Sequence, residues 1–307
     1  MRRLEVNQGT LTKRAGIGRR ESLYGYALIM PMLIGYAIFV IAPLVILLIL
    51  SLTNYSLFGK VSFVGLQNYL KLFTQDATFT ASAVNTVYFA ALLVPLNVVV
   101  TLALALLMYR SFKGVGLFRT ILFTPYVTSM VAWAVVWKYM FQTDNGLINA
   151  VLGMLGTAPV NWLYTESAAI PIAVLVTLLK GLGMNTIIFI SALKDVPEMY
   201  YEAGRLDGAS AWQRFRNITL PMISQAIFLV LILTVIGSFK IFGQIYVMTK
   251  GGPVVSSYVF VYYIYTTAFR TYKFGYASAV SAILFLIILA LTAVQWYGKK
   301  RWVYYET

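Results

Sequence analysis

Residues able to do covalent chemistry are few in this 307-residue chain. The sequence has no His and no Cys, which removes imidazole bases, thiolate nucleophiles, disulfides and the usual zinc ligands. Only 10 carboxylates remain, and no Gly-x-x-x-x-Gly-Lys-Ser/Thr stretch is present to cradle a nucleotide phosphate. The two Gly-Lys pairs, Gly59-Lys60 and Gly298-Lys299, are followed by Val and Lys. We therefore expect no catalytic site, metal or cofactor on this chain.

Charged and polar side chains gather instead in one short segment, Pro197–Pro221. Pro197 suits the first turn of a helix, and Gly208 can end or bend that helix. Ser210 is a suitable N-cap for a second short helix that runs to about Arg216. This pattern predicts a compact helix–Gly–helix element.

Apolar side chains of the same segment recur at helical spacing. Trp212, Phe215 and Ile218 are spaced i, i+3, i+6, and we expect them to form the apolar side of the second helix. An apolar face on a short element without a core of its own indicates docking against another protein.

Long uncharged runs flank this element, and the helices that they form must position it. The chain is 60% hydrophobic and 11% charged, with a mean hydropathy of +0.78, whereas soluble domains are about 25% charged. A helix needs about 20 apolar residues to cross a bilayer core. The runs predict an all-α membrane protein with about six spans. These lie near 25–52, 82–109, 119–141, 168–192, 221–245 and 275–298.

Orientation follows from the distribution of Lys and Arg. Sixteen of the 24 basic residues lie in the two tails and in the loops after the second and fourth spans, and five lie on the opposite side. This bias predicts a cytoplasmic N-terminal tail (1–24), a transmembrane domain (25–298) with the 197–221 loop inside, and a cytoplasmic C-terminal tail (299–307). The net charge of +14 is then a topological signal and a contact to anionic lipid, and we expect no nucleic-acid partner.

Three motifs, in the same order along the chain, resemble those of one protein family. Glu202-Ala-Gly-Arg-Leu-Asp-Gly-Ala209, followed by Ile218-Thr-Leu-Pro221, resembles the EAA loop of ABC importer permeases. With its Asp-Gly-Ala and Trp-Gln, it is similar to the carbohydrate-uptake branch, the maltose and glycerol-3-phosphate type of permease. Phe63-Val-Gly-Leu-Gln-Asn-Tyr69 and Ile245-Tyr-Val-Met-Thr-Lys-Gly-Gly-Pro253 resemble two external segments of the same branch. The chain departs from the pattern at Gly204, where Ala is usual; Gly costs up to about 1 kcal/mol in a helix interior.

The resemblance implies a type I ABC importer-like permease with a cytoplasmic coupling helix, in the cytoplasmic membrane of a bacterium or archaeon. It implies a second homologous permease forming a heterodimer, two cytoplasmic ATPase subunits that hold ATP and Mg, and an extracellular or periplasmic solute-binding protein. The solute would be a sugar or sugar-like molecule, with an oligosaccharide as the first candidate. The residues that the resemblance assigns to ATPase coupling are Glu202, Ala203, Gly204, Asp207, Gly208 and Ala209.

Polar residues inside the spans are candidates for the solute path. Lys180 is the one charge near the middle of a span, where a charge costs about 2.5–3.5 kcal/mol on insertion scales and usually faces a cavity or a partner. It is either a solute contact or a structural pairing residue, and we favour the second. Asn185, Asn85 and Asn97 are further candidates, although intramembrane amides more often form interhelical hydrogen bonds.

Two other classes of membrane protein fit the sequence less well. An ion-coupled secondary carrier would want inverted repeats or acidic residues at mid-membrane, and no Asp or Glu lies within the six predicted spans. A membrane enzyme would need a cluster of reactive side chains, which the missing His and Cys make hard to build. The ABC importer permease is therefore the preferred interpretation, with the secondary carrier as the alternative.

Overall fold

The computed structural model describes residues 11–110 and 112–304, without the side chains of 11–21 and 23. In this part the chain is helical, with a single isolated β-bridge between Thr53 and Phe63. The α-helices are α1 Leu11–Tyr36, α2 Ala42–Ser51, α3 Gln67–Thr74, α4 Ala77–Met108, α5 Val115–Val127, α6 Met130–Met140, α7 Leu147–Met154, α8 Glu166–Lys194, α9 Glu198–Leu206, α10 Ala211–Arg214, α11 Leu220–Met222, α12 Ser224–Phe239, α13 Gly243–Met248, α14 Phe260–Phe269 and α15 Phe274–Gly298. A π-helical turn joins α1 to α2, another joins α10 to α11, and a 3-10 turn follows α15.

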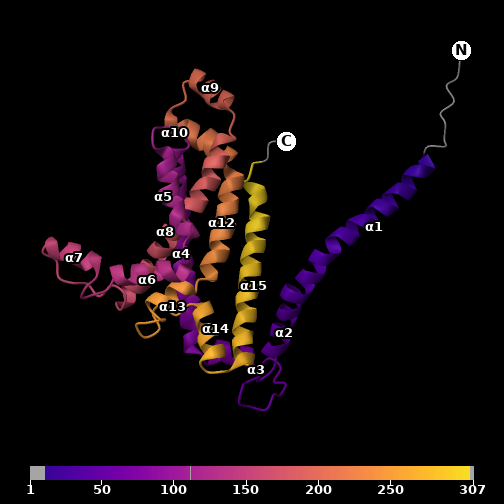
Figure 1. Cartoon of the computed structure of the whole chain (residues 1–307), viewed down its shortest axis with the longest axis vertical. Helices are drawn as coiled ribbons and strands as arrows, with labels where there is room; N and C mark the ends of the chain where they lie inside the picture. The colour runs from indigo at the N-terminus through magenta and orange to yellow at the C-terminus, as the bar shows by residue number, and fades with distance from the viewer. Residues whose placement is uncertain (1–10, 111, 305–307) are drawn as a thin grey trace.

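Long apolar helices confirm the predicted all-α membrane fold. Within the described residues, five segments are long and apolar enough to cross a membrane: Tyr24–Ser51, Ala77–Met108, Glu166–Lys194, Ser224–Met248 and Phe274–Arg301. A bent pair, α5 with α6, makes a sixth if it is counted as one span. The helices α4, α8, α12 and α15 run side by side as a bundle, with α9 and α10 at one end and α3 and α14 at the other (Figure 1). We call these the α9 end and the α14 end.

The third predicted span, 119–141, is not a single straight helix. Its two halves, α5 and α6, meet at an angle of 102°. Thr128 and Ser129 between them have extended backbone, with ψ values of 152° and 136°. Pro125 lies in the last turn of α5, where its missing N–H weakens the helix. The run from Thr120 to Trp137 is uncharged throughout, so hydropathy alone does not reveal the break.

Both predicted tails contain regular structure in their described parts. The first helix already begins at Leu11, within the predicted N-terminal tail of 1–24, and residues 1–10 lie outside the described part. After α15, the C-terminal segment folds back on the bundle: Tyr304 N donates to Ser224 Oγ at 2.9 Å, and Gln225 Nε2 donates to Tyr304 O at 3.1 Å. Residues 305–307 of the predicted C-terminal tail lie outside the description.

The core of the bundle forms where α8 meets its neighbours. Phe89 on α4, Leu178 on α8, Ile245 on α13 and Tyr262 on α14 belong to one buried cluster. A second contact brings the backbones of α8 and α5 together at Gly183: a Cβ built there would lie 2.4 Å from the Leu122 carbonyl oxygen. Helices in membranes gain dispersion energy by such close approach over small residues. Gly183 therefore sets the distance between α8 and the broken span.

Replacing Gly183 with Ala should weaken the α5–α8 pair. The added methyl group forces the two backbones apart, and overpacking of this kind typically costs about 1–3 kcal/mol. We expect a lower midpoint of thermal unfolding for the purified chain in detergent. Gly237→Ala in α12 is the matched control, because its Cβ would meet nothing within 4 Å and should leave the midpoint unchanged or raise it. Equal midpoints for the two variants would contradict the role given to Gly183.

Candidate functional site

The predicted helix–Gly–helix element is present at the α9 end of the bundle (Figure 1). Helix α9 ends at Leu206, and Gly208, two residues further on, has a φ of +74°, the left-handed conformation that favours glycine. Two hydrogen bonds close the turn, from Gly208 N to Arg205 O at 3.1 Å and from Ala209 N to Gly204 O at 2.9 Å. They form the Schellman pattern, which satisfies the last carbonyls of a helix.

Ser210 begins the second helix, as predicted. Its Oγ accepts from Gln213 N at 3.3 Å, while Gln213 Oε1 accepts from Ser210 N at 2.7 Å. This reciprocal pair is a capping box. The prediction that this helix ends near Arg216 is wrong. The helix continues through the π-helical turn Phe215–Thr219 into α11. The element is thus joined to α12 without a flexible linker.

One side of the element is anchored to the bundle. Phe215 and Ile218 pack against a buried cluster of α4, α8 and α12 that includes Phe189 and Leu193. Tyr201 on α9 shares a 3.0 Å hydrogen bond between its hydroxyl and Thr219 Oγ1. The anchored side is therefore shared by α9 and the chain that leads into α12.

Gly204, the departure from the family pattern, lies on this anchored side. A Cβ at that position would lie 3.1 Å from Ile218 Cδ1 and 3.4 Å from Arg214 Cγ and Cδ. The Arg214 guanidinium donates to the Ala209 carbonyl and so lies across α9. Glycine gives both side chains room to pack closely against α9, which offsets its lower helix propensity.

The other side of the element is exposed. Glu202 and Asp207 are exposed carboxylates, and within the described residues neither forms an ion pair. Leu206 is 90% exposed and Trp212 is 65% exposed. The predicted apolar side is therefore split, since Trp212 faces outward while Phe215 and Ile218 face the bundle. An exposed patch that mixes large apolar groups with unpaired carboxylates is typical of a surface that binds a partner.

The structure also places Lys180, the intramembrane cation. Its ammonium donates to Pro125 O at 2.8 Å and to Thr128 O at 2.7 Å, at the junction of α5 and α6. The last carbonyls of a helix lack backbone partners and carry its negative dipole end, which favours a nearby cation. Lys180 thus satisfies carbonyls that the broken span frees. As a solute contact it stays a prediction.

The three candidate amides lie at two different levels. Asn185 Nδ2 donates to Asn97 Oδ1 at 2.8 Å and joins α8 to α4. Asn85, nearer the α14 end, donates to Val255 O at 2.8 Å and to Tyr258 O at 2.9 Å. These bonds tie the loop before α14 to α4. The structure therefore brings Asn97 and Asn185 together and leaves Asn85 apart from them.

Two polar contacts of α8 were not predicted from the sequence. Trp133 Nε1 on α6 donates to Val176 O at 2.9 Å, and Gln244 Nε2 on α13 donates to Thr177 Oγ1 at 3.0 Å. Together with Lys180 and Asn185, they make α8 the helix through which α4, the α5–α6 junction, α6 and α13 are connected. Among the described residues, no three carboxylates lie close enough together to hold a metal ion.

Comparison with known proteins agrees with this geometry. Residues 97–303 match the family described as the binding-protein-dependent transport system inner membrane component. The chain is 32% identical to the probable ABC transporter permease protein YesP of Bacillus subtilis, over 98% of each chain. It is 33% identical to the trehalose/maltose transport system permease protein MalF of Thermococcus litoralis, over 90% of this chain and 93% of that one. A bacterial ABC transporter involved in import of the acidic polysaccharide alginate has the same fold, with a TM-score of 0.82 at 22% identity over 94% of this chain and 99% of that one.

Replacing Lys180 with Met should loosen the junction of α5 and α6. The change removes hydrogen bonds from a charged donor, which are typically worth about 1.5–3 kcal/mol. The chain has no Cys, so spin labels can be attached to Thr120→Cys on α5 and Tyr139→Cys on α6 without background. We expect a broader label-to-label distance distribution and a lower unfolding midpoint.

Lys138→Met on α6 is the matched control, because the structure gives that ammonium no hydrogen-bond partner among the described residues. An unchanged distance distribution in Lys180→Met, combined with weaker solute binding, would instead identify Lys180 as a solute contact.

Proposed function

Because this chain belongs to the family of binding-protein-dependent transport system inner membrane components, we propose that it carries a sugar or sugar-like solute into the cytoplasm, with an oligosaccharide as the first candidate. The family supplies membrane permeases of ABC importers. The name of the Thermococcus relative, a trehalose/maltose permease, supports the solute class. The chain performs no covalent chemistry in this proposal.

The observation that carries the proposal is the two-sided α9–α10 element. Its exposed side offers Glu202, Asp207, Leu206 and Trp212 to a partner, while its other side is fixed to the bundle. A force applied to the exposed side therefore reaches the membrane helices without being absorbed by a loop. We assign Glu202, Ala203, Gly204, Asp207, Gly208 and Ala209 to coupling with a partner ATPase.

Two ATPase subunits hold ATP and Mg in this proposal, because the chain has no phosphate-binding loop. Closure of the ATPase dimer pushes on the α9–α10 element. Helix α8 leads into α9 across the short link 195–197, and the π-helical turn leads from α10 into α12. The push is thereby delivered to two bundle helices at once.

A second homologous permease completes the membrane part. The span Tyr24–Ser51 has no buried residue in its most apolar window, and α1 leads away from the bundle (Figure 1). Helix α2 packs against α15, whereas α1 diverges from the bundle, and this exposed apolar helix favours packing against a partner permease. This supports a heterodimer around the solute path, for which Asn97, Asn185, Asn85 and Lys180 stay candidate residues.

The positive-inside bias supports the orientation. With the α9 end in the cytoplasm, the start of α1 and the C-terminal segment lie on the same side as the ATPase (Figure 1). The α14 end then faces the outside, where the solute-binding protein delivers its cargo. The compartment is the cytoplasmic membrane of a bacterium or archaeon.

Gly208→Leu should abolish ATP-driven uptake while membrane insertion is kept. A side chain at this turn both strains the left-handed backbone and blocks the approach of the ATPase. Gly156→Leu separates the two effects, because Gly156 has φ +77° and, like Gly208, no atom within 4 Å of its Cβ position, but lies far from α9. We expect at least a tenfold loss of uptake for Gly208→Leu and for Glu202→Ala, and little loss for Gly156→Leu.

Uptake is measured with the complete transporter in proteoliposomes, and insertion by the amount of chain in the membrane fraction. Full uptake in both Glu202→Ala and Gly208→Leu would refute the coupling role. A comparable loss in Gly156→Leu would reduce the effect to backbone strain.

A further inference from the structure

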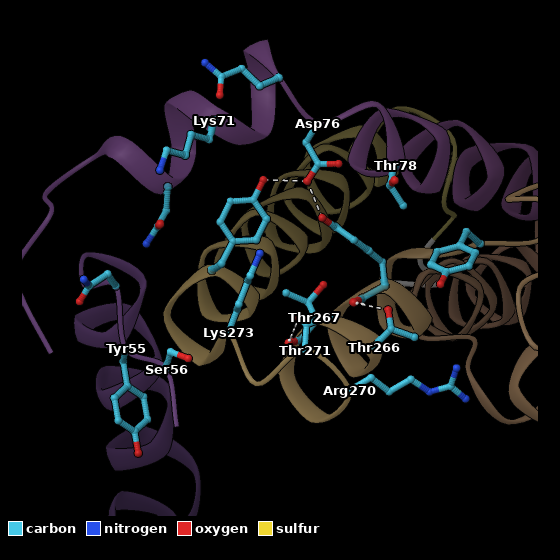
Figure 2. Close-up of a pocket in the computed structure, with 16 residues that line it drawn as sticks. Tyr55, Ser56, Lys71, Asp76, Thr78, Thr266, Thr267, Arg270, Thr271 and Lys273 are labelled. Atoms are coloured by element: carbon cyan, nitrogen blue, oxygen red, sulfur yellow. Dashed lines mark hydrogen bonds between the residues drawn. The ribbon is translucent and has the colours of Figure 1, made fainter. Parts of the chain in front are cut away.

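A cavity of about 800 Å³, lined by polar and tyrosine residues, opens at the α14 end of the molecule, far from the α9–α10 element. Its walls come from the chain before α3, from α3 itself, from the start of α4, from α14 and from the start of α15 (Figure 2). Small-molecule sites typically occupy about 300–1,000 Å³, so the volume suits a ligand of one to a few sugar units. The cavity plays no part in the coupling described above.

Three cations line this cavity, and they come from different elements. Lys71 projects from α3, Arg270 follows α14, and Lys273 precedes α15; the Arg270 side chain extends away from the other two (Figure 2). All three are exposed, and with the described residues none of them makes an ion pair or a side-chain hydrogen bond. Their charge is therefore available to a ligand.

The single carboxylate of the cavity, Asp76, is already engaged. It accepts from Phe79 N at 2.9 Å as the N-cap of α4, from the Tyr276 hydroxyl at 2.7 Å and from the Tyr263 hydroxyl (Figure 2). Burial alone would raise the pKa of Asp76, but these hydrogen bonds outweigh it and hold the pKa below its ordinary value. Asp76 thus ties α4, α14 and α15 together, and the cavity keeps a net charge of +2 from three cations and one carboxylate.

The rest of the lining is rich in neutral hydrogen-bonding groups. Asn54, Gln75, Thr78 and Thr271 are among the neutral polar residues that line the cavity. Such groups can both donate and accept, which is what the hydroxyls of a saccharide require. Lys and Arg supply the charge-assisted hydrogen bonds that carboxylates and phosphates prefer.

We propose that this cavity is a binding site for an anionic saccharide, whose carboxylate or phosphate is held by Lys71 and Lys273, with the charge of Arg270 at the other side of the cavity adding to the attraction, and whose hydroxyls meet the neutral lining. This rests on the proposed import function and narrows its solute class. A solute released at the α14 end would bind here before it enters the bundle. A walled cavity of this size favours a small ligand over an acidic loop of a docking protein, which would need only a flat basic patch.

Glucose, glucuronate and glucose 6-phosphate test the proposal, because they share a ring and differ at C6. Binding of each probe, and of inorganic phosphate alone, is measured by calorimetry on the purified full chain. We expect saturable binding of the two charged sugars, at least tenfold tighter than glucose. In Lys71→Gln/Arg270→Gln/Lys273→Gln, we expect the affinity for the charged sugars to fall at least tenfold, to the level of glucose.

Lys60→Gln is the control, because Lys60 is an exposed cation in the segment between α2 and α3 and does not line the cavity. The triple variant should keep the unfolding midpoint of the native chain, since its three side chains make no described hydrogen bond. The proposal is overturned if the charged sugars do not bind, if Lys60→Gln weakens them equally, or if inorganic phosphate binds as tightly as they do. It is also overturned if the triple variant binds the charged sugars as the native chain does but no longer captures the solute-binding protein.

Failure of the import function would look different. It would leave the probe affinities intact while the complete transporter showed no ATP-driven uptake of any sugar.

Discussion

A bilayer core offers no water to backbone carbonyls, and this constraint explains the arrangement around α8. The break between α5 and α6 frees the carbonyls of Pro125 and Thr128 in a segment that is apolar on both sides. Each unsatisfied group in such a medium costs several kcal/mol, so a broken span is stable only if a neighbour supplies donors. Lys180 supplies them, and it does so from the helix that continues into the α9–α10 element. The stability of the bent span and the position of α8 are thereby linked.

The same helix collects most of the polar contacts in the bundle. Asn185 reaches α4, Trp133 of α6 reaches back to α8, and Gly183 lets α5 approach to backbone contact. In a membrane the apolar effect does little to choose between helix partners, so hydrogen bonds and close packing have to fix the register. A displacement of α8 would therefore change several contacts together. This is the property expected of an element that passes motion from the α9 end to the solute path.

Much of this could be predicted from the sequence, because charge-free runs and cap residues act locally. The spans, the stop at Gly208 and the cap at Ser210 follow from neighbours a few residues away. The break near Pro125 could not be predicted, because the apolar run continues across it. The partner of Asn85 lies about 170 residues further along the chain. The polar cavity combines residues near 54–78 with others near 258–276, and only the folded helices bring them together. Long-range pairing was thus beyond the reach of spacing arguments.

In the proposed mechanism, an ATPase binds the exposed side of the α9–α10 element. A photo-crosslinking amino acid at Leu206, which is 90% exposed at this element, tests it most directly in native membranes. Phe58, 83% exposed at the α14 end, is the matched position. We predict an adduct with an ATP-hydrolysing subunit from Leu206 and none from Phe58. Absence of that adduct at Leu206, or the same adduct at both positions, would contradict the account.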